Sequence, residues 1–204
     1  VQAGERFDAD VVFERLSGDL SVADDVRDDA TVHRPLGLSA MRLGLAAHDG
    51  TWHFTAGLAG SQLGEMAGVA SAHTTPQARW PGPEAPLDGV FQLHVSKLAA
   101  WGAWVPPGWR LGGDLLSAAT LGGRFGALEL SGRLTGRRLE VRNGLQGVQF
   151  TDGTVDISLH GDHAQIEQFE WRGGDGTLRV SGEATLGRQP EADLTLKADH
   201  LRLL

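Results

Sequence analysis

Cysteine is absent from this 204-residue chain, and its absence removes several kinds of chemistry. Without a thiol there is no disulfide framework, no thiolate metal site and no cysteine nucleophile. Redox chemistry is therefore not expected. An oxidising compartment is still compatible with the sequence, because a chain without thiols has nothing there to oxidise.

Basic clusters and long apolar runs are missing as well. Eighteen basic and 26 acidic side chains give a net charge of -8, and no Lys/Arg cluster locally reverses the sign. Such a field repels phosphate backbones, so no nucleic-acid partner is expected. The longest mostly apolar stretch, Leu98 to Trp109, holds two prolines. Its length of about 12 residues falls short of the roughly 18 to 20 that span a bilayer.

The chain begins without an initiator Met, and Val1 to Asp10 carry neither the basic region nor the apolar core of a signal peptide. We therefore expect a piece of a longer protein.

Motifs of catalysis and metal binding are also lacking. The sequence has no G-x-S-x-G elbow, Walker loop, H-E-x-x-H helix or dinucleotide fingerprint. His160-Gly-Asp-His163 is the one tight cluster with ligand-type spacing, but it lacks a distant fourth ligand. Gly173-Gly-Asp-Gly176 is similar to calcium-binding turns of β-solenoids, yet a single copy indicates a strand connection. We predict a non-enzymatic protein with no metal and no cofactor.

Acidic residues crowd the N-terminus, where the first 30 residues hold nine acidic and three basic side chains. Asp24, Asp25, Asp28 and Asp29 lie close together there. This crowding favours a solvated loop, with a calcium site or a basic partner as the alternative.

Glycine is abundant, at 29 of 204 residues or about twice its average usage. From Gly123 onward, turn signals recur at intervals of 9, 11, 10, 8, 12 and 9 residues. This spacing is typical of a run of short strands. The signals are Gly123, Gly132, Asn143, Gly153, Gly161, Gly173 and Gly182.

Apolar residues alternate with polar ones between these signals, as half-buried strands require. The apolar positions are Leu128, Leu130, Leu134, Val155, Ile157, Leu159, Leu178, Val180, Ala184, Leu186, Leu194, Leu196 and Ala198. Further strands are expected at Asp10 to Phe13, Leu16 to Val22, Met41 to Ala46, Trp52 to Ala56 and Val90 to Val95.

An internal repeat indicates how the sheet curves. The kernel apolar-x-Gly-x-apolar occurs five times, centred on Gly18, Gly89, Gly113, Gly132 and Gly182. Counted by two, each glycine falls on the apolar face, where a missing side chain permits a kink that makes a sheet concave. The alternative is that these glycines are turn residues.

Two segments depart from the strand pattern. Leu98, Trp101, Trp104 and Val105 recur at helical spacing after Ser96, which predicts a short helix ending at Pro106. Ser61 to Ala72 is a weaker candidate helix, because it carries Gly64 and Gly68. Thr75 to Pro86, with four prolines, is expected to be a loop and a possible sub-boundary within one elongated β domain spanning residues 1–204.

The glycine and leucine runs resemble the C-terminal region of the TamB family, the inner-membrane-anchored periplasmic component of the translocation and assembly module. That family belongs to the wider AsmA-like bridge-forming lipid-transfer group. The resemblance covers Leu87 to Leu204 and, more loosely, Leu16 to Gly68. Its runs are Trp109-Arg-Leu-Gly-Gly-Asp-Leu, Ala119-Thr-Leu-Gly-Gly-Arg-Phe-Gly-Ala-Leu-Glu-Leu-Ser-Gly, Gly147-Val-Gln-Phe-Thr-Asp-Gly-Thr-Val-Asp-Ile-Ser-Leu-His-Gly-Asp and the GGDGTLRVSGEATL run from Gly173.

The resemblance implies an elongated all-β sheet folded over an apolar groove, a β-taco, in the periplasm. It implies movement of phospholipid toward the outer membrane and outer-membrane biogenesis with an Omp85-type barrel partner. The inner-membrane anchor is expected outside this fragment.

The apolar face itself suits acyl chains or amphipathic polypeptide segments. We therefore predict a lipid conduit whose phospholipid acyl chains contact ten residues. These are Leu128, Leu130, Leu134, Val155, Ile157, Leu159, Leu178, Val180, Leu194 and Leu196. One alternative is a chaperone or docking module that binds outer-membrane barrel strands at the groove or at a sheet edge. A closed-core structural domain is the other.

Overall fold

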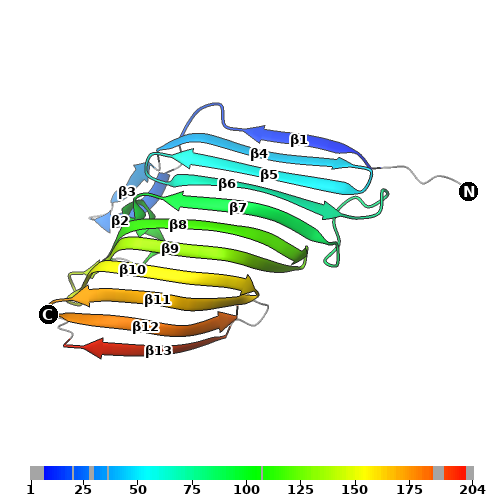
Figure 1. The fold of residues 1–204 in the computed structure, drawn as a ribbon. Coiled ribbons are helices and arrows are strands. Elements are labelled where there is room, and N and C mark those ends of the chain that lie inside the picture. The colour runs from blue at the N-terminus through cyan, green and yellow to red at the C-terminus, as the bar shows by residue number, and fades with distance from the viewer. Residues whose placement is uncertain are drawn as a thin grey trace, which may run out of the picture.

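A single open sheet dominates the computed structural model, which describes residues 7–19, 21–27, 30–35, 37–106, 108–185 and 191–200 (Figure 1). Its eleven strands are all antiparallel and follow one another in chain order, interrupted only by a separate hairpin between the first two. They are β1 (Ala9–Glu14), β4 (Leu38–His48), β5 (Thr51–Gly60), β6 (Gly64–His73), β7 (Leu87–Val95), β8 (Trp109–Arg124), β9 (Ala127–Asn143), β10 (Val148–Gly161), β11 (His163–Gly173), β12 (Gly176–Thr185) and β13 (Ala192–Asp199). The sheet is curved and does not close into a barrel, which confirms the all-β, taco-like prediction.

Three smaller elements complete the described chain. Strands β2 (Ser21–Arg27) and β3 (Ala30–Pro35) form a two-stranded sheet of their own. The predicted helix after Ser96 is the 3₁₀ helix η1 (Leu98–Trp104), which contacts both β8 and β2. The proline-rich segment is a loop, as predicted, and β6 pairs directly with β7 across it.

Turn chemistry explains the tight connections. Asp49 and Gly50 join β4 to β5, and both have positive φ, 49° and 81°. A two-residue Asp-Gly loop of this kind matches the right-handed twist of the strands that it joins. The Gly173 to Gly176 segment is likewise the connection between β11 and β12, as predicted.

Several strand predictions were wrong. Strands β8 and β9 have 16 and 17 residues, so they are not short. Gly132, Gly153 and Gly182 lie inside strands rather than at turns. The sequence spacing misled because a glycine in a strand and a glycine in a turn give the same signal.

The candidate helix at Ser61 to Ala72 is also wrong, because the segment forms the turn into β6 and most of that strand. Met66 and Ala70 lie opposite Leu58 and Phe54 of β5, so the segment's apolar positions follow the strand period of two. Glycine at two positions lowers the helix propensity, and hydrogen bonding to β5 and β7 stabilises the segment as a strand.

The N-terminal predictions fail in two places. The chain leaves β1 after Glu14, and the next strand begins only at Ser21, so the strand predicted from Leu16 is wrong. Asp24 and Asp25 lie in β2 rather than in a loop. Asp28 and Asp29 lie outside the described residues, as does Leu186.

Close approach of a neighbouring strand's backbone is found at four of the five kernel glycines. A Cβ on Gly132 would overlap the carbonyl oxygen of Ala118 and lie 2.5 Å from the Cα of Ala119. Gly89 and Gly182 meet the backbone of their neighbouring strands in the same way. Gly113 also meets the backbone of β9, at a bulge where its φ is 105°. Gly18 lies in the loop after β1, and a Cβ there would have no heavy atom within 4 Å.

Candidate functional site

An unbroken row of non-polar residues crosses the whole sheet. Each member lies directly opposite the next in the strand register, and one residue comes from each of the eleven strands. The row is Phe13, Leu43, Ala56, Gly68, Phe91, Ala119, Gly132, Leu159, Ala164, Ala184 and Ala192. We call the side of the sheet that carries this row the apolar face.

A second row on the apolar face runs parallel to the first. It consists of Met41, Leu58, Met66, Leu93, Ser117, Leu134, Ile157, Ile166, Gly182 and Leu194. Its one polar member, Ser117, is buried and donates a hydrogen bond to the carbonyl oxygen of Arg133 at 3.1 Å. The apolar face therefore presents no polar group at this position.

All ten predicted groove residues lie on the apolar face, as the strand register shows. Only Val155 is buried, with 7% of its surface exposed, whereas Leu128 and Leu196 are 52% and 63% exposed. A second layer of structure would bury such side chains almost completely. The closed-core alternative is therefore wrong for the described residues, and contact with lipid stays a prediction.

An aromatic cluster covers the apolar face at one end of the strands. Phe7 stacks on the buried Trp52, with ring centroids 5.5 Å apart. Trp80 from the proline-rich loop meets Trp52 and Phe54 edge-on, and Phe125 from the β8–β9 turn packs against both Phe54 and Trp80. Four distant segments thus form a small core that closes this margin of the face.

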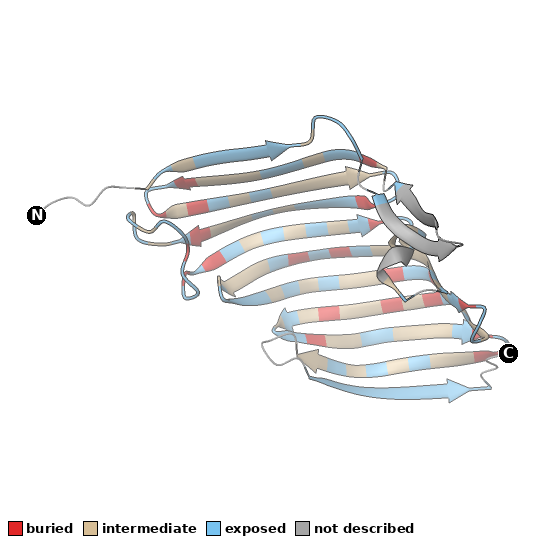
Figure 2. Cartoon of the chain, turned by 180° about the vertical axis from the view of Figure 1, so that it is seen from behind, coloured by how far each residue is buried: buried red, intermediate tan, exposed pale blue. Residues whose placement is uncertain are grey.

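A second small core lies at the other strand ends. Leu38 and Leu63 are buried there, and Trp101 of η1 packs on them. The Trp101 Nε1–H donates to the carbonyl oxygen of Leu63 at 3.3 Å, which holds the indole over the sheet. Figure 2, seen from behind, shows η1 in front of this end of the sheet, leaving the middle uncovered.

Three aromatic rings continue this margin on β10 and β11. Trp171 stacks on Phe150 and meets Phe169 edge-on, with centroids 5.8 and 4.7 Å away. The indole fills the space above Gly153, where a Cβ would overlap its Nε1. The extensive contacts among the strands of the large sheet all join neighbours in that sheet, and the described hairpin β2–β3 contacts mainly η1. No other described sheet therefore packs extensively over the aliphatic middle.

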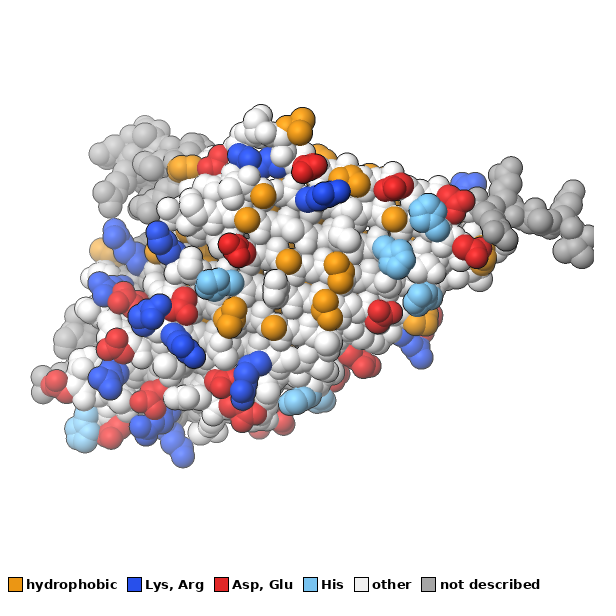
Figure 3. Space-filling view, turned by 45° about the horizontal axis from the view of Figure 1, so that its top comes forward, with side chains coloured by type: hydrophobic (Ala, Val, Ile, Leu, Met, Phe, Trp, Pro, Cys, Tyr) orange, Lys and Arg blue, Asp and Glu red, His pale blue; other side chains and the backbone are white. Residues whose placement is uncertain are grey.

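The opposite face of the sheet carries the ion pairs, and it also exposes single apolar side chains such as Val69, Val90 and Leu116. Arg133 pairs with Asp156 at 2.8 Å, and Arg179 pairs with Glu170 at 2.8 Å. The hydrogen bond from Arg179 to Glu170, reinforced by their opposite charges, raises the pKa of the guanidinium. Figure 3 shows acidic, basic and imidazole side chains scattered over this face, with hydrophobic side chains between them near its middle.

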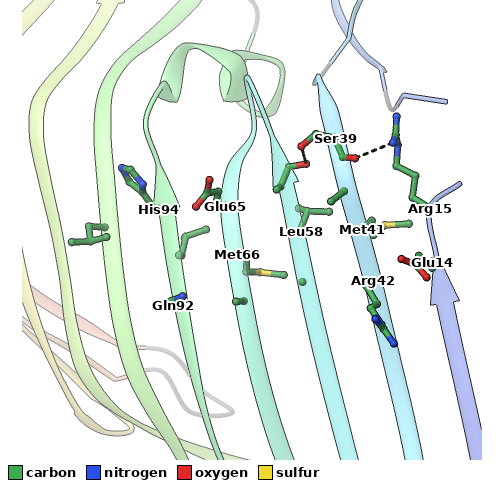
Figure 4. Close-up of a pocket in the computed structure, with 16 residues that line it drawn as sticks. Glu14, Arg15, Ser39, Met41, Arg42, Leu58, Glu65, Met66, Gln92 and His94 are labelled. Atoms are coloured by element: carbon green, nitrogen blue, oxygen red, sulfur yellow. Dashed lines mark hydrogen bonds between the residues drawn. The ribbon is translucent and has the colours of Figure 1, made fainter. Parts of the chain in front are cut away.

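Two shallow hollows lie on the opposite face. The larger, of about 760 Å³, is lined by Arg42, Glu65, Gln92 and His94 around small residues such as Ala67 (Figure 4). The smaller, of about 570 Å³, adjoins it and is lined by apolar and small side chains of β6 to β9. The charged side chains of the larger hollow are dispersed and mixed in sign, and the residues that line the smaller hollow carry no charge.

The histidine pair of the sequence lies at the β10–β11 turn. His160 and His163 face each other across it, and His163 Nε2 lies 3.3 Å from Asp162. No three His, Asp or Glu side chains of the described residues come together as metal ligands would. Within the same residues, no helix is long and apolar enough to cross a membrane.

The ten predicted groove residues leave out the N-terminal half of the apolar face, although the kernel at Gly89 placed part of it there. Leu43 and Phe91 continue the row, and the period-two alternation around them was the available signal. Nothing in the sequence marks Trp80 as part of an end cluster, because it lies in an irregular loop. Comparison with family models, with curated proteins and with solved structures gives no match for this chain.

Proposed function

We propose that the chain is a non-enzymatic carrier of phospholipid acyl chains, which lie along the apolar face between the two margins. One observation carries this proposal: a continuous apolar face crosses eleven strands, and no described element covers its middle. An uncovered apolar surface of this extent is unfavourable in water unless it serves an apolar ligand.

The dimensions suit such a ligand. Neighbouring strands lie about 4.8 Å apart, so eleven strands extend for about 48 Å across the sheet. The hydrocarbon of one bilayer leaflet is about 15 Å thick, half of a typical core. Several acyl chains therefore fit along the face.

Transfer needs no chemical step. Each methylene that leaves water for the face is stabilised by about 0.8 kcal/mol, and the head group stays in water at the open side of the sheet. The face offers no charged anchor among its two central rows, so binding depends on the chain rather than on the head group. This matches the periplasmic, outer-membrane role that the family resemblance implies.

A second candidate is docking of an outer-membrane barrel strand, with an Omp85-type partner. The supporting observation is that β1 and β13 are edge strands, which no described residue pairs on the outer side. Backbone groups at such edges add strands readily. This candidate depends on edge hydrogen bonds, whereas the lipid carrier depends on the apolar face.

Two leucines of nearly equal exposure separate these proposals. Leu128 lies on the apolar face and is 52% exposed, whereas Leu116 lies on the opposite face and is 53% exposed. A photocrosslinking residue at position 128 should capture phospholipid in cells or from vesicles, and one at position 116 should not. Leu128→Arg should reduce copurifying lipid measured by mass spectrometry, while Leu116→Arg serves as the matched control.

Equal lipid labelling at the two positions would contradict the carrier. Docking is tested by Val12→Pro, which alters the β1 edge and leaves the apolar face intact. Loss of barrel-protein capture by this variant, with no lipid labelling at position 128, would favour docking instead.

A further inference from the structure

The edge strand β13 has a self-complementary sequence. Read from Ala192 to Ala198, it is Ala-Asp-Leu-Thr-Leu-Lys-Ala, which is symmetric about Thr195 except that Asp193 is mirrored by Lys197. All residues of β13 are exposed, and no described residue pairs with its free edge. A strand of this kind is a template for a second strand.

The free edge carries the backbone groups of the even-numbered residues. Thr185 N–H donates to the carbonyl oxygen of Glu191 at 2.8 Å, just before β13 begins. In an antiparallel pair, such hydrogen-bonded positions alternate, and the β12–β13 register has no shift. The odd residues therefore point their N–H and C=O groups to β12, and Ala192, Leu194, Leu196 and Ala198 point theirs outward.

The charges of β13 do not match those of its own neighbour. Asp193 lies opposite Glu183 of β12, and Lys197 lies opposite Arg179, so both cross-strand pairs have like charge. Arg179 is already paired with Glu170. Neither Asp193 nor Lys197 has an ion pair with a described residue. Like charges directly opposite each other destabilise a sheet, so these two side chains lack the partner that a sheet normally provides.

We propose that two copies of this chain pair antiparallel through β13, with Thr195 opposite Thr195 of the second copy. In this register Asp193 of each copy faces Lys197 of the other, which gives two opposite-charge pairs, and Leu194 of each copy faces Leu196 of the other. The two charge pairs fall at non-hydrogen-bonded positions, where side chains approach most closely. The four even residues of each copy bond with those of the other through their outward backbone groups.

The symmetry of this contact joins the apolar faces. A twofold axis perpendicular to the sheet relates two identical antiparallel strands, so the same face of each copy points to the same side. The sheet then runs through 22 strands with one continuous apolar face. The pairing does not rest on the proposed lipid function, because it follows from the edge alone.

The other edge does not offer the same match. When β1 pairs with itself about Val11 or Val12, the two registers with the longest overlap, Glu14 lies opposite Asp8 or Asp10. These like charges oppose the contact. Head-to-tail pairing of β13 with β1 would instead generate rings or open chains of copies.

Charge reversal provides the test, measured by sedimentation of the lipid-free 204-residue chain. The wild type is expected to sediment with twice the 21.7 kDa mass of the chain. Asp193→Lys alone and Lys197→Asp alone place like charges opposite each other in both pairs, and each should raise the dissociation constant about tenfold or more. An equimolar mixture of the two variants restores both opposite-charge pairs, so it should dimerise. The double swap D193K/K197D should dimerise as well.

The β12–β13 register also predicts that both single variants fold. Asp193→Lys faces Glu183 within its own chain and Lys197→Asp faces Arg179, so each removes a like-charge pair from the monomer. Circular dichroism should therefore show an intact sheet in both. A monomeric wild type, single variants that dimerise like the wild type, a mixture that stays monomeric, or a ladder of larger oligomers would each overturn the proposal. Association through the apolar faces would be insensitive to these charges.

Discussion

Gly132 tests the idea that glycine notches let the strands approach each other. In Gly132→Ala, the new methyl group would overlap the Ala118 carbonyl oxygen and lie 2.5 Å from the Ala119 Cα and Cβ. These are backbone and Cβ atoms of the neighbouring strand, so no flexible side chain can move aside. Overpacking of this kind typically costs about 1 to 3 kcal/mol of unfolding free energy. For a chain of 204 residues, that is a fall in Tm of about 2 to 12 °C.

A matched control lies one strand away. The Cβ of Gly122→Ala would have no heavy atom within 4 Å. This variant should be stabilised by about 0.4 to 1 kcal/mol, because alanine restricts the unfolded chain more than glycine does. Thermal unfolding followed by circular dichroism compares the two variants directly. If Gly132→Ala unfolds at the same temperature as Gly122→Ala or above it, then β8 and β9 do not need a glycine at position 132 in order to approach each other closely.

Two further predictions concern the aromatic margins. Trp52→Ala should lower the free energy of unfolding by about 3 to 5 kcal/mol, since the side chain is only 2% exposed and stacks on Phe7. Trp80→Ala, at a position 55% exposed, should lower the free energy of unfolding by clearly less than Trp52→Ala does. Both losses are measured by denaturant titration. Equal losses would refute the inference that Trp52 is the centre of that cluster. Gly153→Ala should displace the Trp171 indole and so change the near-ultraviolet circular dichroism, and an unchanged spectrum would show that the ring does not occupy that space.

Alternation was the reliable signal in this sequence. Period-two patterns alone predict the ten groove residues, and all of them lie on the apolar face. The reason is local: successive side chains of a strand point to opposite sides whatever the strand pairs with. The same logic applied to Leu43 and Phe91 would have extended the predicted site across the N-terminal strands.

Glycine was the ambiguous signal. The sequence pattern is compatible with Gly132 and Gly182 as turn signals and as notches, and the structure places them inside β9 and β12. Only a neighbouring strand reveals which role applies, because a notch exists where another backbone comes too close for a Cβ. The helix predicted at Ser61 to Ala72 failed for a related reason, since pairing with β5 and β7 overrode a local pattern.

The amino-acid sequence by itself determined that this chain is a β protein with one apolar side, because period and composition act residue by residue. The tertiary structure decided which parts of the chain cover the apolar face. One aromatic margin assembles from segments as distant as Phe7, Trp80 and Phe125, and no second layer among the described residues covers the middle of the face. The sheet also decided which charges meet, leaving Asp193 and Lys197 opposite like charges within the chain. Those pairings depend on register, which is a property of two strands together and not of either one alone.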